Sequence, residues 1–339
     1  MKILHITESY FPETGGVSAM MVLLSESLAG QGHEVTVATR YNPKRKTKVI
    51  NRVKVEEFSV SGKFHNCYHG EVESYQNFVR NFDCDVLTIY AAQTWAADLV
   101  FPLLKEINTK KIFITCGFSS LYDPNYREYY EKMPDVLRSF DHLIYFDQYS
   151  WDYAFGQKHS INHFSIIPEC ADYGGFEPKG KTFREEYSIK TKYFALCVAN
   201  YGRSKAQHYL LETFLKTLSK DLSLVFIGGK PNGRNQKLYF RLLQLIGVVV
   251  KIHDRTRSIK LLTGIKRGMV VKAFHEADLF LLGSSFEVGT PAVIYESMAA
   301  GLPFISSKCG SLGELNYSGG WVVNSTREMA NGIDILLNS

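Results

Sequence analysis

Two acidic side chains, Glu287 and Glu296, stand on either side of a turn that joins an apolar run to a helix-like segment. An ionised carboxylate only accepts hydrogen bonds, so it can take two neighbouring hydroxyl groups of one ligand. Such charge-assisted bonds are about twice as strong as neutral ones. The pattern indicates a site for a hydroxyl-rich ligand such as a sugar nucleotide, and Gly289 and Thr290 of the turn belong to the same candidate site.

Two cations, Arg203 and Lys205, follow another apolar run and open the next helix. Positive charges at a helix N-terminus oppose the helix dipole, so a helix with a purely structural role gains nothing from them there. A bound anion such as a diphosphate would explain both residues. The alternative that stays open is a pair of solvated cations.

Adjacent glycines follow two further strand-like runs. Gly15 and Gly16 lie where the first run turns into a helix; they let the backbone approach a ligand and leave N–H groups at a helix end that carries about +0.5 of a charge. Gly228 begins a second Gly-Gly turn. That turn lacks the spacing of ATP-binding and nicotinamide-binding loops, so neither kind of site is indicated there.

Strand-like and helix-like segments alternate along the chain, which predicts parallel, doubly wound sheets. The pattern breaks at 169–190, which we interpret as a linker. We expect an α/β fold with two Rossmann-like domains, 1–168 and 191–339, that face each other across a cleft, with ligands beyond the carboxyl ends of the strands. The expected strands are 2–7, 34–38, 85–90, 111–115, 142–146, 163–167, 193–199, 222–227, 248–252, 278–282 and 304–306, and the expected helices are 17–28, 94–106, 124–139, 206–218, 236–245, 269–276, 291–300 and 326–337.

The residues around the two acids resemble the signature of glycosyltransferase family 4, whose members are retaining enzymes with the GT-B fold. Glu296 opens the sequence Glu-Ser-Met-Ala-Ala-Gly-Leu-Pro, which keeps the family's helix. The Gly15–Gly16 turn, the helix after it and the sequence 32–35 (Gly-His-Glu-Val) are similar to the family's N-terminal domain, and the Gly228 turn is similar to its Gly-rich donor turn. The resemblance implies transfer of a sugar, with retention, from a nucleotide diphosphate sugar.

The resemblance also implies a role for each charged residue. Glu296 would hold the ribose of the donor, and Glu287 would reach the hydroxyls of the transferred sugar. Lys205 fits the second position of the diphosphate clamp, and Arg203 would add charge beside it. We therefore name Lys205, Arg203 and Glu287 as catalytic candidates. The departing phosphate can itself take the acceptor's proton, so we expect no dedicated base. The fixed positive charge of Arg203, Lys205 and the Gly15–Gly16 amides makes a metal ion dispensable, and we expect no cofactor besides the donor substrate.

Three positions depart from the family pattern. Glu287 and Glu296 have eight residues between them, where the family has seven. Asn200 occupies the place of the first clamp residue, an Arg, although we keep it in the donor site. Cys116 stands where a His contacts the sugar. These departures leave two alternatives open: a catalytically silent nucleotide-sugar-binding relative, and a sugar-nucleotide epimerase or hydrolase of the same fold.

The acceptor side is expected in the first domain, around Cys116 and the tyrosine-rich stretch that follows it. Tyr122 and Tyr126 could stack their rings on an acceptor sugar. Packing of a helix onto its own domain is the equal alternative. The acceptor itself is expected to be a glycan or a lipid-linked molecule.

The composition is that of a globular protein of about two domains, with 339 residues, 45% of them hydrophobic, and a net charge of +5. No apolar run approaches the roughly 18 residues of a membrane span, and the six scattered cysteines indicate free thiols. We expect a cytoplasmic protein with no nucleic-acid partner. The basic stretch Lys44–Lys54 is either a solvated loop or a peripheral contact with the inner face of the membrane.

Overall fold

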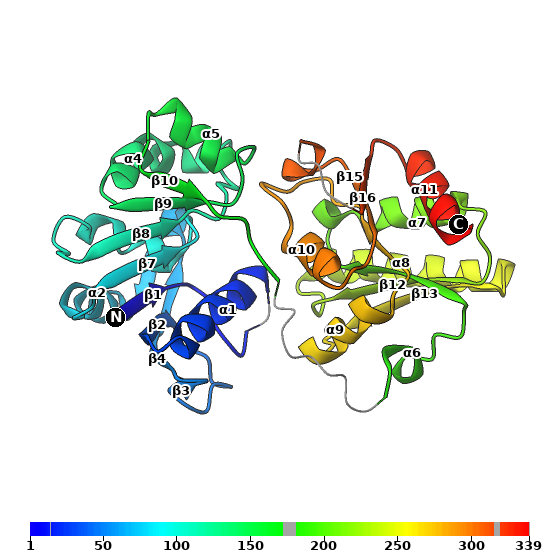
Figure 1. Ribbon diagram of the computed structural model, residues 1–339, viewed down its shortest axis with the longest axis horizontal. Helices are drawn as coiled ribbons and strands as arrows, with labels where there is room; N and C mark the ends of the chain where they lie inside the picture. The colour runs from blue at the N-terminus through cyan, green and yellow to red at the C-terminus, as the bar shows by residue number, and fades with distance from the viewer. Residues whose placement is uncertain (14, 172–180, 315–318, 339) are drawn as a thin grey trace. The chain divides into compact units, whose positions relative to one another are not determined.

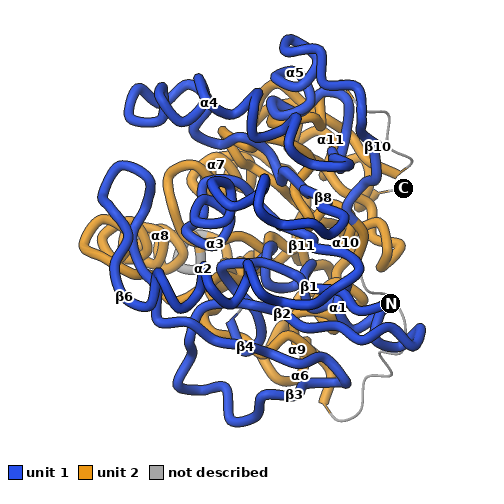
Figure 2. Tube along the Cα trace, turned by 90° about the vertical axis from the view of Figure 1, so that its left-hand side faces the viewer, with its two compact units in different colours: residues 1–169 blue, residues 170–339 orange. Residues whose placement is uncertain are grey.

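The structure is a computed structural model that describes residues 1–13, 15–171, 181–314 and 319–338. The chain divides into two compact units, Met1–Glu169 (unit 1) and Cys170–Ser339 (unit 2), which Figure 2 shows in different colours. No helix among the described residues is long and apolar enough to cross a membrane.

Unit 1 is built on an eight-stranded sheet with the order β10-β9-β8-β7-β1-β2-β4-β3 (Figure 1). Neighbouring strands are parallel except for the antiparallel pair β3 and β4. A separate hairpin pairs β5 with β6. The strands are β1 (Lys2–Ile6), β2 (Glu34–Arg40), β3 (Val49–Ile50), β4 (Val53–Phe58), β5 (Val60–Gly62), β6 (Tyr68–Gly70), β7 (Val86–Tyr90), β8 (Lys110–Ile114), β9 (His142–Tyr145) and β10 (Phe164–Ile166).

The helices of unit 1 differ from expectation: the helices Val72–Asn81 (α2) and Trp151–Lys158 (α5) were not expected, and the helix at 94–106 is shorter than expected. The helix expected at 94–106 is only the short α3, followed by the 3₁₀ turn η2. Pro102 lies in that turn and has no N–H to continue an α-helix, so the chain leaves the helix early. The helical segments are α1 (Gly16–Gly30), η1 (Phe64–Asn66), α2 (Val72–Asn81), α3 (Trp95–Asp98), η2 (Phe101–Leu103), η3 (Pro124–Tyr126), α4 (Arg127–Arg138) and α5 (Trp151–Lys158).

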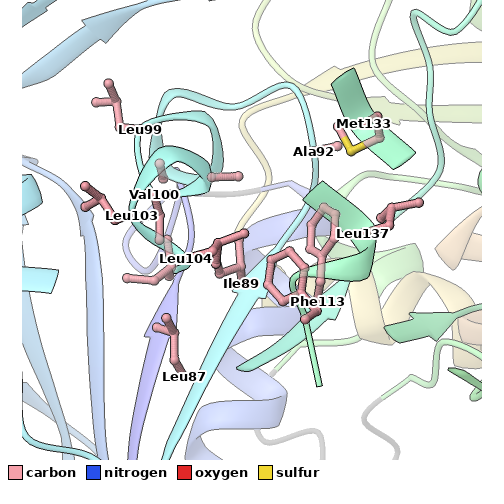
Figure 3. Packing of buried hydrophobic residues seen from close by; sticks show 14 of the residues in the cluster. Leu87, Ile89, Ala92, Leu99, Val100, Leu103, Leu104, Phe113, Met133 and Leu137 are labelled. Carbon is pink, nitrogen blue, oxygen red and sulfur yellow. The ribbon is translucent and has the colours of Figure 1, made fainter. Parts of the chain in front are cut away.

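The core of unit 1 lies between its sheet and its helices, as Figure 3 shows. Leu87 and Ile89 of β7 and Phe113 of β8 pack with Leu104 and with Leu137 of α4, and each is at most 2% exposed. A fully buried side chain of this kind stabilises the fold by about 1.5–3 kcal/mol. The strand ends that follow these residues are therefore held on a rigid frame.

Unit 2 has a six-stranded parallel sheet with the order β13-β12-β11-β14-β15-β16. The order runs outward from β11 in both directions, which is doubly wound topology. Its strands are β11 (Tyr193–Val198), β12 (Leu222–Gly228), β13 (Arg257–Thr263), β14 (Leu279–Leu282), β15 (Phe304–Ser307) and β16 (Gly320–Val323). Its helical segments are α6 (Phe183–Glu186), η4 (Arg203–Lys205), α7 (Gln207–Lys216), α8 (Arg234–His253), α9 (Arg267–Glu276), α10 (Ala292–Ala299), η5 (Gly310–Gly313) and α11 (Thr326–Asn338). The expectation of an α/β protein with two Rossmann-like domains is confirmed.

One expected strand was wrong. Residues 248–252 belong to α8, which runs on from the helix expected at 236–245, and the strand of this region is β13. Leu243, Gly247 and Val250 are buried at the spacing of one helical face, and α8 packs on β13 through them. A short apolar run has the same composition in a buried strand and in a buried helix, so packing on β13 decides between them.

Part of the expected linker is packed structure. Residues 172–180 of the stretch 169–190 lie outside the described residues, and α6 lies against α9 of unit 2. The Glu276 carboxylate accepts hydrogen bonds from the backbone N–H groups of Phe183 at 2.7 Å and Arg184 at 3.0 Å. These bonds satisfy two of the free donors at the start of α6.

Two neighbouring leucines can test which face of α8 packs on unit 2, which we call the register of the helix. Leu243 is 1% exposed and Leu242 is 51% exposed. Leu243→Ala should lower the free energy of unfolding by about 2–5 kcal/mol, because it removes buried methyl groups and leaves a cavity. Leu242→Ala should change it by less than about 0.5 kcal/mol. Urea unfolding measures both values, and equal effects would contradict this register.

Candidate functional site

The site of unit 2 lies where the strand order reverses, between β11 and β14. Open parallel sheets bind ligands beyond the carboxyl ends of the strands at this switch point. The loops that leave the two strands are joined there, because the N–H of Ser285 donates to the carbonyl of Ser204 at 2.8 Å. Lys205 and Glu287, on these two loops, form an ion pair of 2.5 Å between Nζ and Oε1.

The three charged residues of these loops have different surroundings. The side chains of Lys205 and Glu287 are 31% and 15% exposed. Arg203 is exposed and forms no ion pair with any residue that the structure describes. The three-residue turn η4 holds Arg203 and Lys205, and Ala206 after it has a left-handed backbone with φ of 43°. The cations therefore lie on a tight turn before α7 rather than inside it.

Asn200 links the loop after β11 to the glycine turn after β12. Its Oδ1 accepts a hydrogen bond from the N–H of Gly229 at 3.3 Å, and its carbonyl accepts from the Gln207 amide at 3.0 Å. Position 228 requires a glycine, because a Cβ there would lie 2.5 Å from the carbonyl oxygen of Ala199. Both predicted donor-site residues thus hold neighbouring loops together.

Glu296 lies on α10 and is 15% exposed at its side chain. Its Oε1 pairs with Nη2 of Arg267, in the first turn of α9, at 2.6 Å. Each of the two acids found in the sequence therefore has a cation of its own. Their Oε1 atoms take part in these ion pairs, and a carboxylate has a second oxygen that can accept hydrogen bonds from a ligand.

The loop between the two acids packs against the loop after β15. A Cβ on Gly310, whose φ is 52°, would lie 2.1 Å from the carbonyl oxygen of Gly289 and 3.0 Å from Cβ of Glu287. Thr290 is buried beside them. Burial, with the charge of Glu287 added, raises the pKa of the nearby Cys309 thiol to about 11. The thiol is therefore neutral at physiological pH.

In unit 1, Gly15 and Gly16 lie where expected, since α1 begins at Gly16. Among the described residues, no side chain caps this helix end, and a Cβ on either glycine would meet no atom within 4 Å. Contact of these glycines with a diphosphate stays a prediction.

The basic stretch Lys44–Lys54 is not a uniform surface patch. Arg45 is 8% exposed, pairs with Glu57, and donates to the carbonyls of Phe11 at 2.7 Å and Tyr10 at 3.1 Å. The expectation of surface charge was wrong for Arg45, because this guanidinium fastens the loop that precedes the Gly15–Gly16 turn.

Two further cations of the stretch are paired at the surface. Lys54 contacts Glu34 at 2.7 Å, and Lys48 approaches Glu56 at 3.7 Å. Exposed pairs of this kind contribute little to stability, but they reduce the net positive charge of the stretch. Its contact with a membrane stays a prediction.

Cys116 follows β8 with a left-handed backbone, φ 58°. The loop is held by the buried Asp152, which accepts a hydrogen bond from the Gly117 N–H at 2.9 Å and another from the Thr115 hydroxyl. Burial, with the nearby Glu169 carboxylate added, raises the pKa of the Cys116 thiol far above its ordinary value. The thiol stays protonated at neutral pH and can donate or accept only weak hydrogen bonds.

The two candidate tyrosines of the acceptor side lie in different environments. Tyr122 is 74% exposed, and its ring meets Trp151 edge-on at 4.8 Å. Tyr126 is 5% exposed and packs among Phe64, Tyr129 and other rings of the core. The packing alternative therefore holds for Tyr126, while contact of the exposed Tyr122 with an acceptor stays a prediction.

Both parts of the chain match models of glycosyltransferase families. Residues 192–339 match the family described as "Glycosyl transferases group 1", and residues 2–136 match the family described as "Starch synthase catalytic domain". Spore coat protein SA of Bacillus subtilis (strain 168) is 28% identical over 164 residues, which are 46% of this chain and 42% of that protein. The aligned region thus spans less than half of the length of this curated relative.

Solved structures share the fold over nearly the whole chain. Anabaena Alr3699/HepE, in complex with UDP and glucose, has a TM-score of 0.74 at 15% identity and covers 100% of this chain and 90% of its own. A glycosyltransferase from Rickettsia africae ESF-5 has a TM-score of 0.75 at 14% identity and covers 99% of this chain and 88% of its own. The protein has the GT-B fold of the glycosyltransferases.

In unit 1 of this GT-B protein, the strand order reverses between β7 and β1. A residue at this switch point was not predicted from the sequence. Gln93 follows β7, beside β1, with a φ of 62°. Its N–H donates to the Tyr129 hydroxyl at 2.9 Å, and its Oε1 accepts from the Ser119 hydroxyl at 3.2 Å. Its side-chain nitrogen is buried with no hydrogen-bond partner among the described residues. Because ligands bind beyond the carboxyl ends of parallel strands, the position of Gln93 just after a predicted strand could have indicated it.

A second missed residue is Asp98, at the end of α3. Its carboxylate accepts hydrogen bonds from the hydroxyls of Tyr68 at 2.8 Å and Tyr129 at 2.7 Å. Burial raises its pKa to about 6, although both hydrogen bonds lower it. Asp98 thereby ties the β5–β6 hairpin and α4 to the loop after β7.

The raised pKa of Asp98 makes stability depend on pH. The folded state keeps this proton up to about pH 6, whereas the unfolded chain loses it near pH 4, so stability falls as pH rises through that window. Asp98→Asn should remove the fall. We expect the difference in free energy of unfolding between the two proteins to shift by up to about 3 kcal/mol between pH 4 and pH 7.

His5 is the internal check on that measurement. Burial lowers its pKa to about 4, so its effect on stability has the opposite sign in the same window. Because both proteins contain His5, its effect cancels in the difference. A difference that is constant with pH would show that folding does not raise the pKa of Asp98.

Proposed function

We propose that this protein is a retaining glycosyltransferase of family 4, which moves a sugar from a nucleotide diphosphate sugar to a hydroxyl of a glycan or lipid-linked acceptor. The observation that carries the proposal is the Lys205–Glu287 pair at the switch point of unit 2. It places a cation for a diphosphate beside a carboxylate for sugar hydroxyls. Glu296, with its helix, supports a ribose-holding role.

The proposed chemistry depends on the leaving group. As the bond to the sugar stretches, negative charge grows on the β-phosphate, and groups already aimed at that charge are usually the largest catalytic contribution. Lys205 and the exposed Arg203 would supply this charge without a metal ion. The acceptor oxygen would bond to the anomeric carbon on the face from which the diphosphate leaves, and the same phosphate would take the acceptor's proton there. Attack on that face is what lets the sugar keep its anomeric configuration.

The first donors to test follow from proteins of the same fold. Alr3699/HepE has been crystallised with UDP-glucose, and a starch synthase IV catalytic domain from Arabidopsis thaliana with ADP and acarbose. We therefore propose uridine and adenosine diphosphate sugars as first candidates for this chain. Guanosine and thymidine diphosphate sugars complete the set.

The donor can be identified by thermal shift and the reaction by NMR. A donor at a hundred times its dissociation constant should stabilise the protein by about 2.7 kcal/mol. With an acceptor glycan present, the anomeric proton of the product should show retention. Binding without turnover would favour the catalytically silent relative, turnover without an acceptor would favour the hydrolase or epimerase, and an inverted product would contradict the retaining mechanism.

Lys205→Ala should lower turnover by about 2–4 kcal/mol of activation free energy, since it removes charge used in the transition state. The loss has a second cause, because Glu287 is left without its partner beside the phosphate. The double variant Lys205→Ala/Glu287→Ala separates the two causes: full recovery would contradict a catalytic role for Lys205. Lys216→Ala, which breaks an exposed pair with Glu212 on α7, is the matched control and should leave turnover unchanged.

Glu296→Ala should weaken binding of the nucleoside diphosphate by about 1.5–3 kcal/mol, the size of hydrogen bonds to a charged group. Isothermal calorimetry measures this affinity directly. Arg267→Ala is the control, because it removes the partner of Glu296 and keeps the carboxylate. If both variants weaken binding equally, the ion pair positions α10 and α9, and the ribose contact is refuted.

A further inference from the structure

The positive charge of this protein is concentrated in one segment. Residues 228–275 contain eleven Lys and Arg and a single acid, Asp254, so the segment carries +10 while the whole chain carries +5. Some of these cations have local partners: Arg257 is buried against Phe214, and Arg267 pairs with Glu296. Three of the exposed cations that remain, Arg234, Lys237 and Arg241, lie on α8.

Helix α8 also carries an exposed apolar stripe. Leu238, Leu242, Leu245 and Val249 are 58%, 51%, 62% and 53% exposed. Their spacing of four, three and four residues places them on one helical face. We call these four residues the outer stripe. Exposed single apolar residues are ordinary, but a continuous row of large ones on one helix marks an interaction surface.

The outer stripe lies opposite the face that packs on unit 2. Leu243, Gly247 and Val250 are buried, and α8 contacts β13. At about 100° per residue, the outer stripe is centred about 140° around the helix from these residues. Figure 1 shows α8 beside β12 and β13. The helix is thus fixed by one face and presents the other to solvent.

Cations border the outer stripe along one side. Arg234, Lys237 and Arg241 are exposed and fall between the outer stripe and the packed face of the same helix. None of them forms an ion pair with a described residue, and α8 contains no acid from end to end. An apolar row beside a row of cations is the pattern of helices that lie in the interface of an anionic membrane.

We infer that α8 docks unit 2 onto an anionic lipid surface, with the outer stripe among the acyl chains and the three cations on the headgroups. Charge complementarity selects this partner. A second copy would bring two purely cationic helices together, and like charges oppose such pairing. At 20 residues α8 is about 30 Å long, so it offers several anchoring points along the plane of the surface.

The test uses the full chain and vesicles of phosphatidylcholine, pure or mixed with phosphatidylglycerol. The protein should sediment with the mixed vesicles and bind the pure ones at least tenfold more weakly. Each basic residue near an anionic surface strengthens binding about fivefold. The variant Arg234→Gln/Lys237→Gln/Arg241→Gln should therefore lose at least tenfold, and Leu242→Gln/Leu245→Gln should lose a similar factor without any change of charge.

Matched controls lie outside α8. Lys44→Gln/Lys46→Gln removes two exposed cations of the other basic stretch, and Leu218→Gln removes an apolar side chain that is 81% exposed. Both should bind mixed vesicles as the unaltered protein does. Circular dichroism and thermal melting check that each variant is folded. We expect all of them to fold, because the altered side chains are exposed.

Three outcomes would overturn the inference. The α8 variants, once shown to be folded, could bind mixed vesicles normally. The Lys44/Lys46 control could account for the loss instead, which would assign membrane contact to unit 1. Sedimentation velocity without lipid could show a dimer that Leu242→Gln/Leu245→Gln dissociates, which would assign the outer stripe to a second copy of the chain.

Discussion

The reversal of strand order in the sheet of unit 2 is the constraint on which the candidate site depends. It sets the loops after β11 and β14 side by side, so that Lys205 and Glu287 meet although 82 residues separate them. A partly exposed ion pair adds only up to about 1 kcal/mol to stability, so its importance is positional. The backbone bond between Ser285 and Ser204 holds the same loops without any charged side chain. A substitution of either charge should therefore alter the chemistry of the site more than its shape.

The ion pairs of the two acids are compatible with ligand binding. A carboxylate offers about four lone-pair positions on two oxygens, and Lys205 and Arg267 each contact one oxygen, Oε1 of Glu287 and of Glu296. A cation that stays beside a carboxylate is partly neutralised until the ligand arrives. Under the proposed mechanism, donor binding would draw Glu287 toward sugar hydroxyls and leave more of the charge of Lys205 for the phosphate. The pair would then act as a resting state of the site.

Some features of this chain could be predicted from its sequence and others could not, because a sequence pattern records composition and spacing but not packing. The buried parallel strands β11 and β12 were predicted within one residue, because strands covered on both faces read as continuous apolar runs. The same signal failed at 248–252, where only packing on β13 distinguishes helix from strand. Charge patterning could not separate the buried Arg45 from its solvated neighbours, since the difference lies in Glu57 and in distant carbonyls. The place of Gln93, whose side-chain nitrogen has no partner among the described residues, depends on backbone angles that composition does not encode.

The glycine at position 310 limits how the loop that carries Glu287 can change. A Cβ at 310 would stand 2.1 Å from the carbonyl oxygen of Gly289, and the φ of 52° at Gly310 is one that glycine adopts readily. Any larger residue there would push against the backbone between the two acids. The turn after β15 therefore acts as a stop that sets where an acid on a different loop can lie.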